Sequence, residues 1–295
     1  MLPAKEILIR PPVEAYSVLI PVTGGCSWNH CRFCGVYKGI QNYEIRPLND
    51  VLKDIEIAAS WYKDSPYVYL AGGNPTSAPT EYLCEVIQKI KEKFPFVKRI
   101  SSYAKVLDIV RKSDEELKQL AEAGLTIAYM GMESGSDIIL RYMKKGTTAK
   151  SLISAATRLL KAGIQVSLYI ILGLGGKKWT DIHAEETAKV LNAINPTYFR
   201  FRTLNVLENS PLRADIEAGD FEILTPLEIL VEMRRIIAGL QPSLTSKMRN
   251  DHISNYVNFE SDNIGQDKTE LLNALDQYIS DPRVAEWRHK NLKQM

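Results

Sequence analysis

Two stretches of this chain repeat one layout, in which a helix is followed by Ala-Gly and then by an apolar strand. The first helix starts at a capping box (113–116) and ends at Gly124, and its strand spans 125–131. The second helix ends at Gly163, and its strand spans 164–172. Glycine suits the left-handed position after a helix, and a mostly apolar strand is typical of one buried on both faces. The repeat predicts βα units and a parallel sheet.

The rest of the chain follows the same alternation and raises the number of predicted strands to six. The remaining strands are expected at 17–22, 67–71, 97–103 and 197–204, and further helices at 47–62, 80–94 and 181–194. Six units are fewer than a closed (β/α) barrel contains. In parallel β/α folds the active site lies at the carboxyl ends of the strands.

The alternation stops near Leu207, which divides the chain into two predicted parts. Thr225 and Pro226 are typical of the cap and first turn of a further helix, and a last helix is expected at 268–280 after a polar stretch. We therefore expect a core at 1–206 and an extension at 207–295 that packs against the open side of the barrel.

Three of the four cysteines lie close together after the first predicted strand, in GGCSWNHCRFCGVY. Cys26, Cys31 and Cys34 have the spacing C-x4-C-x2-C. Thiolates are soft ligands, and three this close can converge on one metal centre, such as an iron–sulfur cluster. No fourth cysteine is near, so one iron of a four-iron cluster would remain open. With His30, the same cysteines are also compatible with a structural Cys3His zinc site in a non-catalytic protein.

The cysteine stretch resembles the cluster loop of radical SAM enzymes, whose usual motif is C-x3-C-x-aromatic-C. The first spacing is four residues here, which resembles a branch with the loop GCSxNxCxFCGxY, similar elsewhere to coproporphyrinogen-dehydrogenase and Elongator-type radical SAM proteins. The resemblance implies an α/β fold, an open six-unit parallel (β/α)6 partial TIM barrel with a mainly helical C-terminal extension. It also implies a 4Fe–4S cluster on Cys26, Cys31 and Cys34, whose open iron binds S-adenosyl-L-methionine.

The same resemblance implies which residues contact S-adenosylmethionine. Gly72, Gly73 and Asn74 match the turn after the second strand that binds the amino group of the cofactor, with Asn in place of Glu. Without the cysteine loop, this turn would be equally compatible with an ordinary connection between strand and helix. Lys145 is equally compatible with a solvated surface lysine. The other implied contacts are Ser102, Tyr103, Glu133, Lys145, Ser167 and Leu172.

Three residues are candidates for contact with a substrate. Arg200 and Arg202 alternate with phenylalanines on the sixth strand, so both arginines lie on one face. Facing into the barrel they would bind a carboxylate or phosphate, whereas facing outward they would be surface charges. His252, in the polar stretch DHISNY, is a candidate proton donor or substrate contact, or a loop histidine with local hydrogen bonds.

Composition limits the classes of partner. Lys and Arg number 37 against 35 Asp and Glu, and no basic run stands out, so nucleic acid is not indicated. The longest apolar stretch, 166–176, is too short to cross a bilayer, and the first residues lack a signal-peptide core. A reducing cytoplasmic location is therefore expected.

The resemblance implies radical chemistry on a small molecule. A reduced cluster, supplied by a one-electron donor such as flavodoxin or ferredoxin, would cleave S-adenosylmethionine to a 5′-deoxyadenosyl radical. The radical would abstract hydrogen from a substrate that the two arginines suggest is anionic, with an oxidoreductase- or lyase-type outcome. Radical methyl or methylthio transfer is the enzymatic alternative. Methylthio transfer needs an extra cluster, for which only Cys84 remains, and Cys84 is expected to be a small buried apolar residue.

Overall fold

The computed structural model describes residues 7–289. Its chain divides into two compact units. The first contains the chain up to Asn29, Val36–Met130 and Ser154–Val166, and the second contains His30–Gly35, Gly131–Ile153 and the chain from Ser167. The ends of the predicted core and extension, at 1–6 and 290–295, lie outside the described residues.

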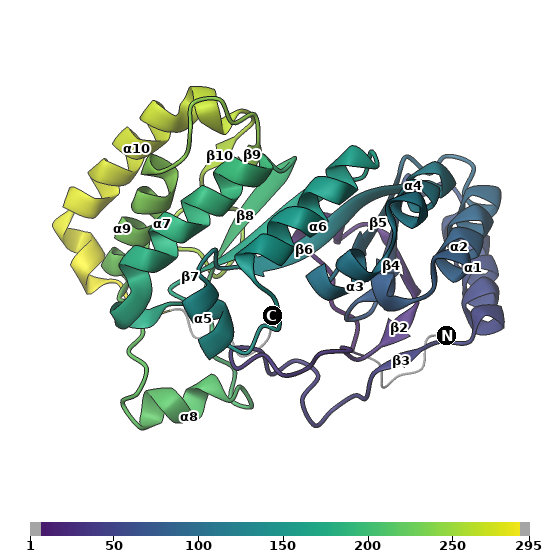
Figure 1. The fold of residues 1–295 in the computed structure, drawn as a ribbon, viewed down its shortest axis with the longest axis horizontal. Coiled ribbons are helices and arrows are strands. Elements are labelled where there is room, and N and C mark those ends of the chain that lie inside the picture. The colour runs from purple at the N-terminus through teal and green to yellow at the C-terminus, as the bar shows by residue number, and fades with distance from the viewer. Residues whose placement is uncertain (1–6, 290–295) are drawn as a thin grey trace. The chain divides into compact units, whose positions relative to one another are not determined.

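The first unit is built on parallel strands with helices between them (Figure 1). Its strands pair in the order β1 (Val18–Pro21), β4 (Tyr67–Ala71), β5 (Arg99–Tyr103) and β6 (Leu125–Glu133), although the last three residues of β6 belong to the second unit. Its other elements are η1 (Pro12–Glu14), β2 (Thr23–Gly24), β3 (Glu44–Ile45), α1 (Leu48–Tyr62), η2 (Pro75–Ser77), α2 (Thr80–Lys93), α3 (Val106–Arg111), α4 (Asp114–Ala123) and most of α6 (Ala149–Lys161).

Local sequence signals explain these elements. In β4 every residue after Tyr67 is buried, as a strand covered on both faces requires. The capping box that starts α4 is present, with Ser113 and Glu116 bonding to each other's backbone N–H. Gly124 ends α4 at a φ of 128°, a conformation that favours glycine. The βα units predicted in this part of the chain are confirmed.

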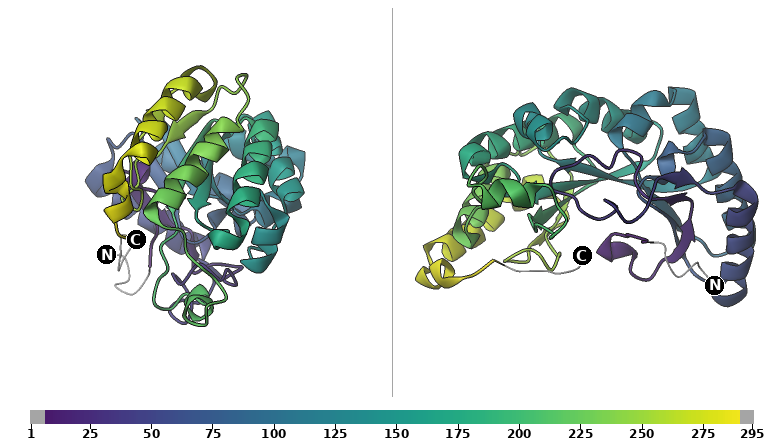
Figure 2. Two further views of the ribbon diagram at one scale, coloured as in Figure 1. Left: turned by 90° about the vertical axis from the view of Figure 1, so that its left-hand side faces the viewer. Right: turned by 90° about the horizontal axis from the view of Figure 1, so that it is seen from below.

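The second unit continues the parallel order and adds elements of the extension. Strands β7 (Gln165–Leu172), β8 (Tyr198–Thr203) and β9 (Lys247–Arg249) are parallel, and β10 (Glu260–Ser261) is antiparallel to β9. The helices α9 (Pro226–Ala238) and α10 (Ile264–Ser280) pack side by side (Figure 2). The remaining elements are α5 (Asp137–Tyr142), α7 (Gly176–Ile194), α8 (Leu212–Glu217) and η3 (Pro282–Glu286).

The two faces of β7, β8 and β9 differ sharply in polarity. One face carries side chains at most 1% exposed, namely Leu168, Ile170, Phe199, Phe201 and Met248. The other face carries Arg200 and Arg202, and the register places Tyr169 beside Arg200. The prediction that both arginines share one face of the sixth barrel strand is confirmed, and this face is opposite the apolar one.

In both units the main strand pairs are parallel, and β10 with β9 is the antiparallel pair of the extension. The sheet is mostly parallel, so the fold is α/β, an open partial TIM barrel. The extension is mainly helical, as predicted, but β9 and β10 lie inside the polar stretch, where no strand was predicted. Helix α10 starts at Ile264, earlier than expected, because the side chain of Asn263 caps it. The boundary between a core ending at 206 and an extension stays a prediction.

None of the described helices combines the length and the apolarity that crossing a bilayer requires.

Candidate functional site

The cysteine loop begins in the first unit, in contact with the turn that follows β4. The N–H of Gly73 donates to the carbonyl oxygen of Gly25 at 3.0 Å. A Cβ atom on Gly73 would lie 2.1 Å from that oxygen and 2.9 Å from the Cα of Cys26. Gly72 has a φ of 125°, which favours glycine. The two glycines predicted to contact the cofactor therefore also let the turn approach the backbone of Cys26.

Asn74 fastens the cysteine loop to helix α3. Its buried side chain accepts a hydrogen bond from the N–H of Ser27 at 3.0 Å and donates to the hydroxyl of Ser27 at 2.8 Å. The same amide donates to the carboxylate of Asp108 at 2.8 Å. Burial raises the pKa of Asp108, and the bond from Asn74 opposes that rise. The sequence offered one signal for this contact, which is the Asn in the position where the family motif has Glu.

Ser102 and Tyr103 end strand β5 in the same unit. The hydroxyl of Ser102 donates to the carbonyl oxygen of Tyr103 at 2.9 Å, and Ser102 is 1% exposed. The ring of Tyr103 packs edge-on against Tyr69 and Tyr129, with centroids 5.8 and 6.3 Å away. Both residues are thus held by their own strand and its neighbours, and their contact with the cofactor stays a prediction.

The second half of the cysteine loop belongs to the second unit, where Arg32 anchors it. The N–H of Arg32 donates to the carbonyl of Met143 at 2.9 Å, and the carbonyl of Arg32 accepts from the N–H of Leu212 at 2.9 Å. Its guanidinium lies 4.5 Å from the ring centroid of Tyr142 and pairs with Asp215. The segment between Cys31 and Cys34 is therefore held by residues next to or within α5 and α8.

Glu133 and Lys145, two predicted cofactor contacts, form an ion pair. Lys145 Nζ lies 2.6 Å from Glu133 Oε1 and 5.9 Å from the ring centroid of Phe33. Glu133 is 8% exposed and has a φ of 62°, which is unfavourable for a residue with a side chain. The pair therefore lies beside the residue that precedes Cys34.

Ser167 and Leu172 lie at the two ends of the second-unit part of β7, and both are buried. The hydroxyl of Ser167 has no hydrogen-bond partner within residues 7–289. Leu172 ends the strand, and Gly173 follows with a φ of 82°. Their contacts with the cofactor stay predictions.

A fully buried carboxylate, which sequence reasoning missed, binds the backbone at this turn. Glu232 of α9 accepts the N–H of Gly173 at 2.6 Å and the hydroxyl of Thr180 at 2.7 Å. His183 of α7 lies 3.7 Å away and contacts the hydroxyl of Ser134 at 2.8 Å. Burial raises the pKa of Glu232 to about 7 and lowers that of His183 to about 4. A single Glu within the apolar sequence LEILVEM was the available signal.

The raised pKa of Glu232 predicts a stability that depends on pH. The folded protein keeps this proton up to a pH of about 7, whereas the unfolded chain loses it near 4.5. The contribution of Glu232 to stability therefore falls as the pH rises between these values, by about 3 kcal/mol at roughly 1.4 kcal/mol for each pKa unit. His183 acts oppositely, since its pKa falls from 6.5 to about 4 on folding.

The free energy of unfolding of Glu232→Gln, relative to that of the wild type, should therefore rise by about 3 kcal/mol between pH 4.5 and pH 7. Urea unfolding of the cluster-free protein across this range measures the difference, and Glu228→Gln, in the partly exposed first turn of the same helix, is the control. A stability difference that is constant across the range would contradict the raised pKa.

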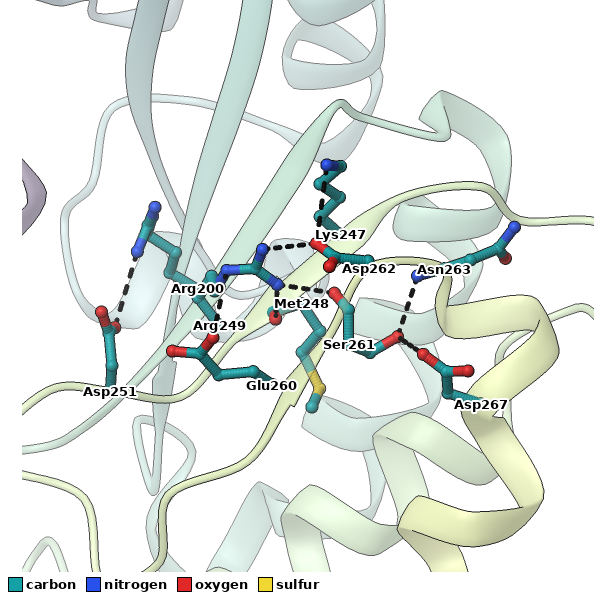
Figure 3. A network of polar contacts seen from close by, with 10 residues as sticks. All are labelled: Arg200, Lys247, Met248, Arg249, Asp251, Glu260, Ser261, Asp262, Asn263 and Asp267. Atoms are coloured by element: carbon teal, nitrogen blue, oxygen red, sulfur yellow. Dashed lines mark hydrogen bonds and ion pairs between the residues drawn. The ribbon is translucent and has the colours of Figure 1, made fainter.

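Arg202 is positioned without a carboxylate partner among the described residues. Its guanidinium lies 4.6 Å from the ring centroid of Tyr169, which stacks it in place. Arg200 Nη1 lies 3.5 Å from a carboxylate oxygen of Asp251 (Figure 3). The Nε atoms of both arginines lack a hydrogen-bond partner within residues 7–289. Burial raises the pKa of Tyr169, and the two guanidinium groups oppose the rise.

The cations of the neighbouring strand β9 are neutralised, in contrast to Arg202. Arg249 lies 2.6 Å from Asp262 and 3.7 Å from Glu260, and Lys247 lies 3.5 Å from Asp262 (Figure 3). The uncompensated positive charge on this face is therefore on β8.

His252 lies in a segment that is bonded to β8. Its Nδ1 accepts the N–H of Ser254 at 3.1 Å, so the neutral ring carries its proton on Nε2. The hydroxyl of Ser254 accepts the N–H of Thr203 at 3.1 Å, and Asn255 donates to the carbonyl of Phe201 at 2.9 Å. The alternative of a loop histidine with local hydrogen bonds therefore holds for Nδ1 of His252.

The donor set of the cysteine loop fits an iron–sulfur cluster. No disulfide forms among the four cysteines, and the three in the loop are partly exposed. Cys84 lies on α2, away from the loop in sequence, and is partly exposed rather than buried as expected. Its partial burial raises the pKa of the thiol. In neither unit do the described residues gather three or more His, Cys, Asp or Glu side chains around one metal position. The loop passes from the first unit to the second after Asn29, so Cys26 belongs to one and Cys31 and Cys34 to the other.

Comparison with known proteins agrees with this donor set. The model of the radical SAM superfamily matches residues 20–191. Anaerobilin synthase of Escherichia coli O157:H7 is 25% identical over 210 residues, which cover 68% of this chain and 46% of that protein. Coproporphyrinogen III oxidase (HemN) from Escherichia coli has a TM-score of 0.57 at 16% identity, covering 75% of this chain and 51% of that one. Archaeal Elp3 from Methanocaldococcus infernus has a TM-score of 0.53 at 14% identity, and the match covers 88% of this chain and 63% of that one.

These similarities have different weights. The two solved structures show the fold alone, and this chain spans less than half the length of the anaerobilin synthase that it matches. The family match covers more than half of the chain and includes the three loop cysteines and the turn after β4. Enzymes of this family use a 4Fe–4S cluster and S-adenosylmethionine, which argues against a non-catalytic zinc protein. The chain belongs to the radical SAM superfamily of enzymes, and its fold resembles those of coproporphyrinogen III oxidase and Elp3.

Proposed function

We propose that this enzyme reductively cleaves S-adenosylmethionine and abstracts hydrogen from an anionic small molecule bound at Arg200 and Arg202. Cys26, Cys31 and Cys34 would hold the cluster. The cluster and S-adenosylmethionine, when bound, supply the one-electron chemistry that starts the reaction. The outcome is of oxidoreductase or lyase type, and the electron donor is a protein such as flavodoxin or ferredoxin in the cytoplasm.

The uncompensated charge of Arg202 carries the proposal for an anionic substrate. Guanidinium groups bind carboxylates and phosphates through two parallel hydrogen bonds. Stacking on Tyr169 fixes the group before a ligand arrives, at the contact distance of 4.6 Å. The Nε atoms of Arg200 and Arg202 lack partners in the described part of the chain, which supports a ligand at both. Arg202 is partly exposed, but its buried Nε–H lacks an acceptor in the described part of the chain, which is costly, so a bound anion would stabilise it.

Asp251 and His252 extend this site along the same segment. The carboxylate of Asp251 is 3.5 Å from Arg200 and its side chain is 44% exposed, so an anionic ligand would replace it at little cost. His252 keeps a proton on Nε2, because its Nδ1 is used by Ser254. The proposal assigns His252 the role of proton donor or substrate contact.

The contacts of S-adenosylmethionine form the rest of the proposal. The turn at Gly72 would bind the amino group of the cofactor. Lys145 would leave its ion pair with Glu133 and pair with the carboxylate of the cofactor. Methyl or methylthio transfer is the alternative reaction. Methylthio transfer needs an extra cluster, for which Cys84 is the one cysteine outside the loop. The full set of proposed contacts is Gly72, Gly73, Asn74, Ser102, Tyr103, Glu133, Lys145, Ser167 and Leu172.

Arg202→Gln is expected to weaken the binding of small anions. A hydrogen bond to a charged group is worth about 1.5–3 kcal/mol, so the affinity should fall about tenfold or more. Titration calorimetry of the reconstituted protein at low salt measures this, with glutarate as the carboxylate probe and inorganic phosphate as the phosphate probe.

Arg249→Gln is the matched control, because Glu260 and Asp262 already occupy that guanidinium. It should keep the affinity of the wild type for the preferred probe. Equal binding by the wild type and Arg202→Gln, or no binding of either probe to the wild type, would contradict an anion site on β8.

A further inference from the structure

The turn after β7, which begins at Gly173, is held in its conformation by a residue from a distant part of the chain. Gly173 has a φ of 82°, and a Cβ atom there would lie 2.8 Å from Cδ1 of Ile229. The carbonyl of Leu172 still accepts the N–H of Leu204, the residue after β8, at 2.9 Å. The N–H of Gly173 instead leaves the sheet and donates to Glu232 at 2.6 Å. The turn is therefore fastened by a side chain of the extension, 59 residues further along the chain.

The carboxylate that fastens the turn is costly to bury. Glu232 is 0% exposed and lies on α9 between apolar residues such as Leu230 and Met233. Burying a carboxylate costs several kcal/mol unless hydrogen bonds compensate. Its two oxygens are satisfied by Gly173 and Thr180. An apolar residue would complete the buried stripe of α9 at lower cost, so the carboxylate is explained by the turn that it holds.

The fastened turn lines a cavity at the carboxyl ends of β7 and β8. The cavity has a volume of about 390 Å³, within the range of small-molecule sites. Gly173 lines it together with Leu204 and Asn205, which follow β8, and Ile216 of α8. Ligands of parallel β/α folds bind at this end of the strands. The conformation of Gly173 therefore shapes one wall of a ligand-sized space.

We propose that Glu232 is a positioning residue for S-adenosylmethionine, which holds the turn at Gly173 in the conformation that receives the adenosine part of the cofactor. This inference rests on the proposed function, which counts Leu172 among the residues that contact the cofactor. The side chain acts through the backbone of Gly173 and need not touch the cofactor. Above a pH of about 7, where Glu232 is ionised, its bond from Gly173 is charge-assisted and holds the turn more firmly than a neutral acceptor would.

Two substitutions separate positioning from packing. Glu232→Met keeps a long helix-forming side chain but removes both acceptors, and Glu232→Gln keeps a neutral acceptor. Thr180→Val is the matched control, because it removes one bond to Glu232 and leaves the bond from Gly173. The reconstituted protein is tested by titration calorimetry with S-adenosylhomocysteine, and by hydrogen exchange of the peptide that contains Gly173.

At pH 8, where Glu232 is ionised, we expect Glu232→Met to bind S-adenosylhomocysteine about tenfold more weakly and to exchange the amide of Gly173 about tenfold faster, as loss of one charge-assisted hydrogen bond predicts. Glu232→Gln should lie between it and the wild type, and Thr180→Val should match the wild type in both. Should Glu232→Met not fold, the Gln variant decides the matter, since unchanged exchange at Gly173 overturns the inference.

The inference and the proposed function fail in different ways. If the wild type binds S-adenosylhomocysteine and folded Glu232→Met binds it equally well, Glu232 does not position the cofactor, and the proposed function is unaffected. If the wild type with a complete cluster does not bind S-adenosylhomocysteine at all, the proposed cofactor contacts fail and the inference falls with them.

Discussion

Replacing Cys26, Cys31 and Cys34 together by alanine is expected to reduce 5′-deoxyadenosine formation to the background of an assay without protein. Alanine supplies no ligand, and a cluster of this kind is held by thiolates. Iron and sulfide content should fall with the product, while circular dichroism stays that of the wild type. The fold should survive, because the loop is also held by backbone bonds at Gly25 and Arg32.

The cysteine outside the loop provides the control for that experiment. Cys84→Ala on α2 should keep both the iron and the product. Product or iron retained by the triple variant would contradict the assignment of the three loop cysteines. Loss of both in Cys84→Ala would show that the fourth thiol is needed.

The second large effect is expected from Gly73→Ala, which adds a methyl group where the turn meets the cysteine loop. The new Cβ atom would lie 2.1 Å from the carbonyl oxygen of Gly25 and 2.9 Å from the Cα of Cys26. Both atoms are backbone, so the loop itself must move. Overpacking of this kind costs roughly 1–3 kcal/mol or more, and the displaced Cys26 should lower the iron content. Urea unfolding and iron analysis after reconstitution measure the two effects.

Gly163→Ala separates the contact from the general effect of replacing a glycine. Gly163 has a φ of 89°, but nothing lies within 4 Å of the Cβ that it would gain. It should cost about 1 kcal/mol through conformation alone and leave the iron content unchanged. Equal losses in the two variants would show that the close approach at Gly73 is not what holds the loop.

The barrel strands were predicted well, because most of them are buried on both faces and therefore consist of nearly continuous apolar residues. Strand β4 matches the prediction at both ends, at Tyr67 and Ala71. Helix α4 was found through the capping box of Ser113, whose signal is local. The cysteine loop was found for the same reason, since its ligands lie within a few residues of one another.

Elements that depend on distant contacts were not predicted. Strand β9 has three residues, two of them charged, and exists because its backbone pairs with β8 at Tyr198 and Arg200. Helices α3 and α5 have six residues each, too few to show an apolar stripe. Such elements are set by tertiary pairing rather than by their own periodicity.

The candidate site shows the same division between local and distant information. The shared face of Arg200 and Arg202 followed from the two-residue period of a strand. The contacts of Asn74 with Asp108 and of Gly173 with Glu232 join residues 34 and 59 positions apart. Contacts over such distances in the sequence leave no pattern in residue spacing. Only the structure could show that Asp108 and Glu232 support the turns at Asn74 and Gly173.

Electron paramagnetic resonance of the reduced cluster, with and without S-adenosylmethionine, tests the central claim most directly. The protein would be reconstituted anaerobically with iron and sulfide and then reduced. If an iron without a protein ligand binds the cofactor, adding S-adenosylmethionine changes the spectrum of the cluster. A complete cluster, confirmed by iron and sulfide analysis, whose spectrum is the same with and without the cofactor would contradict the account.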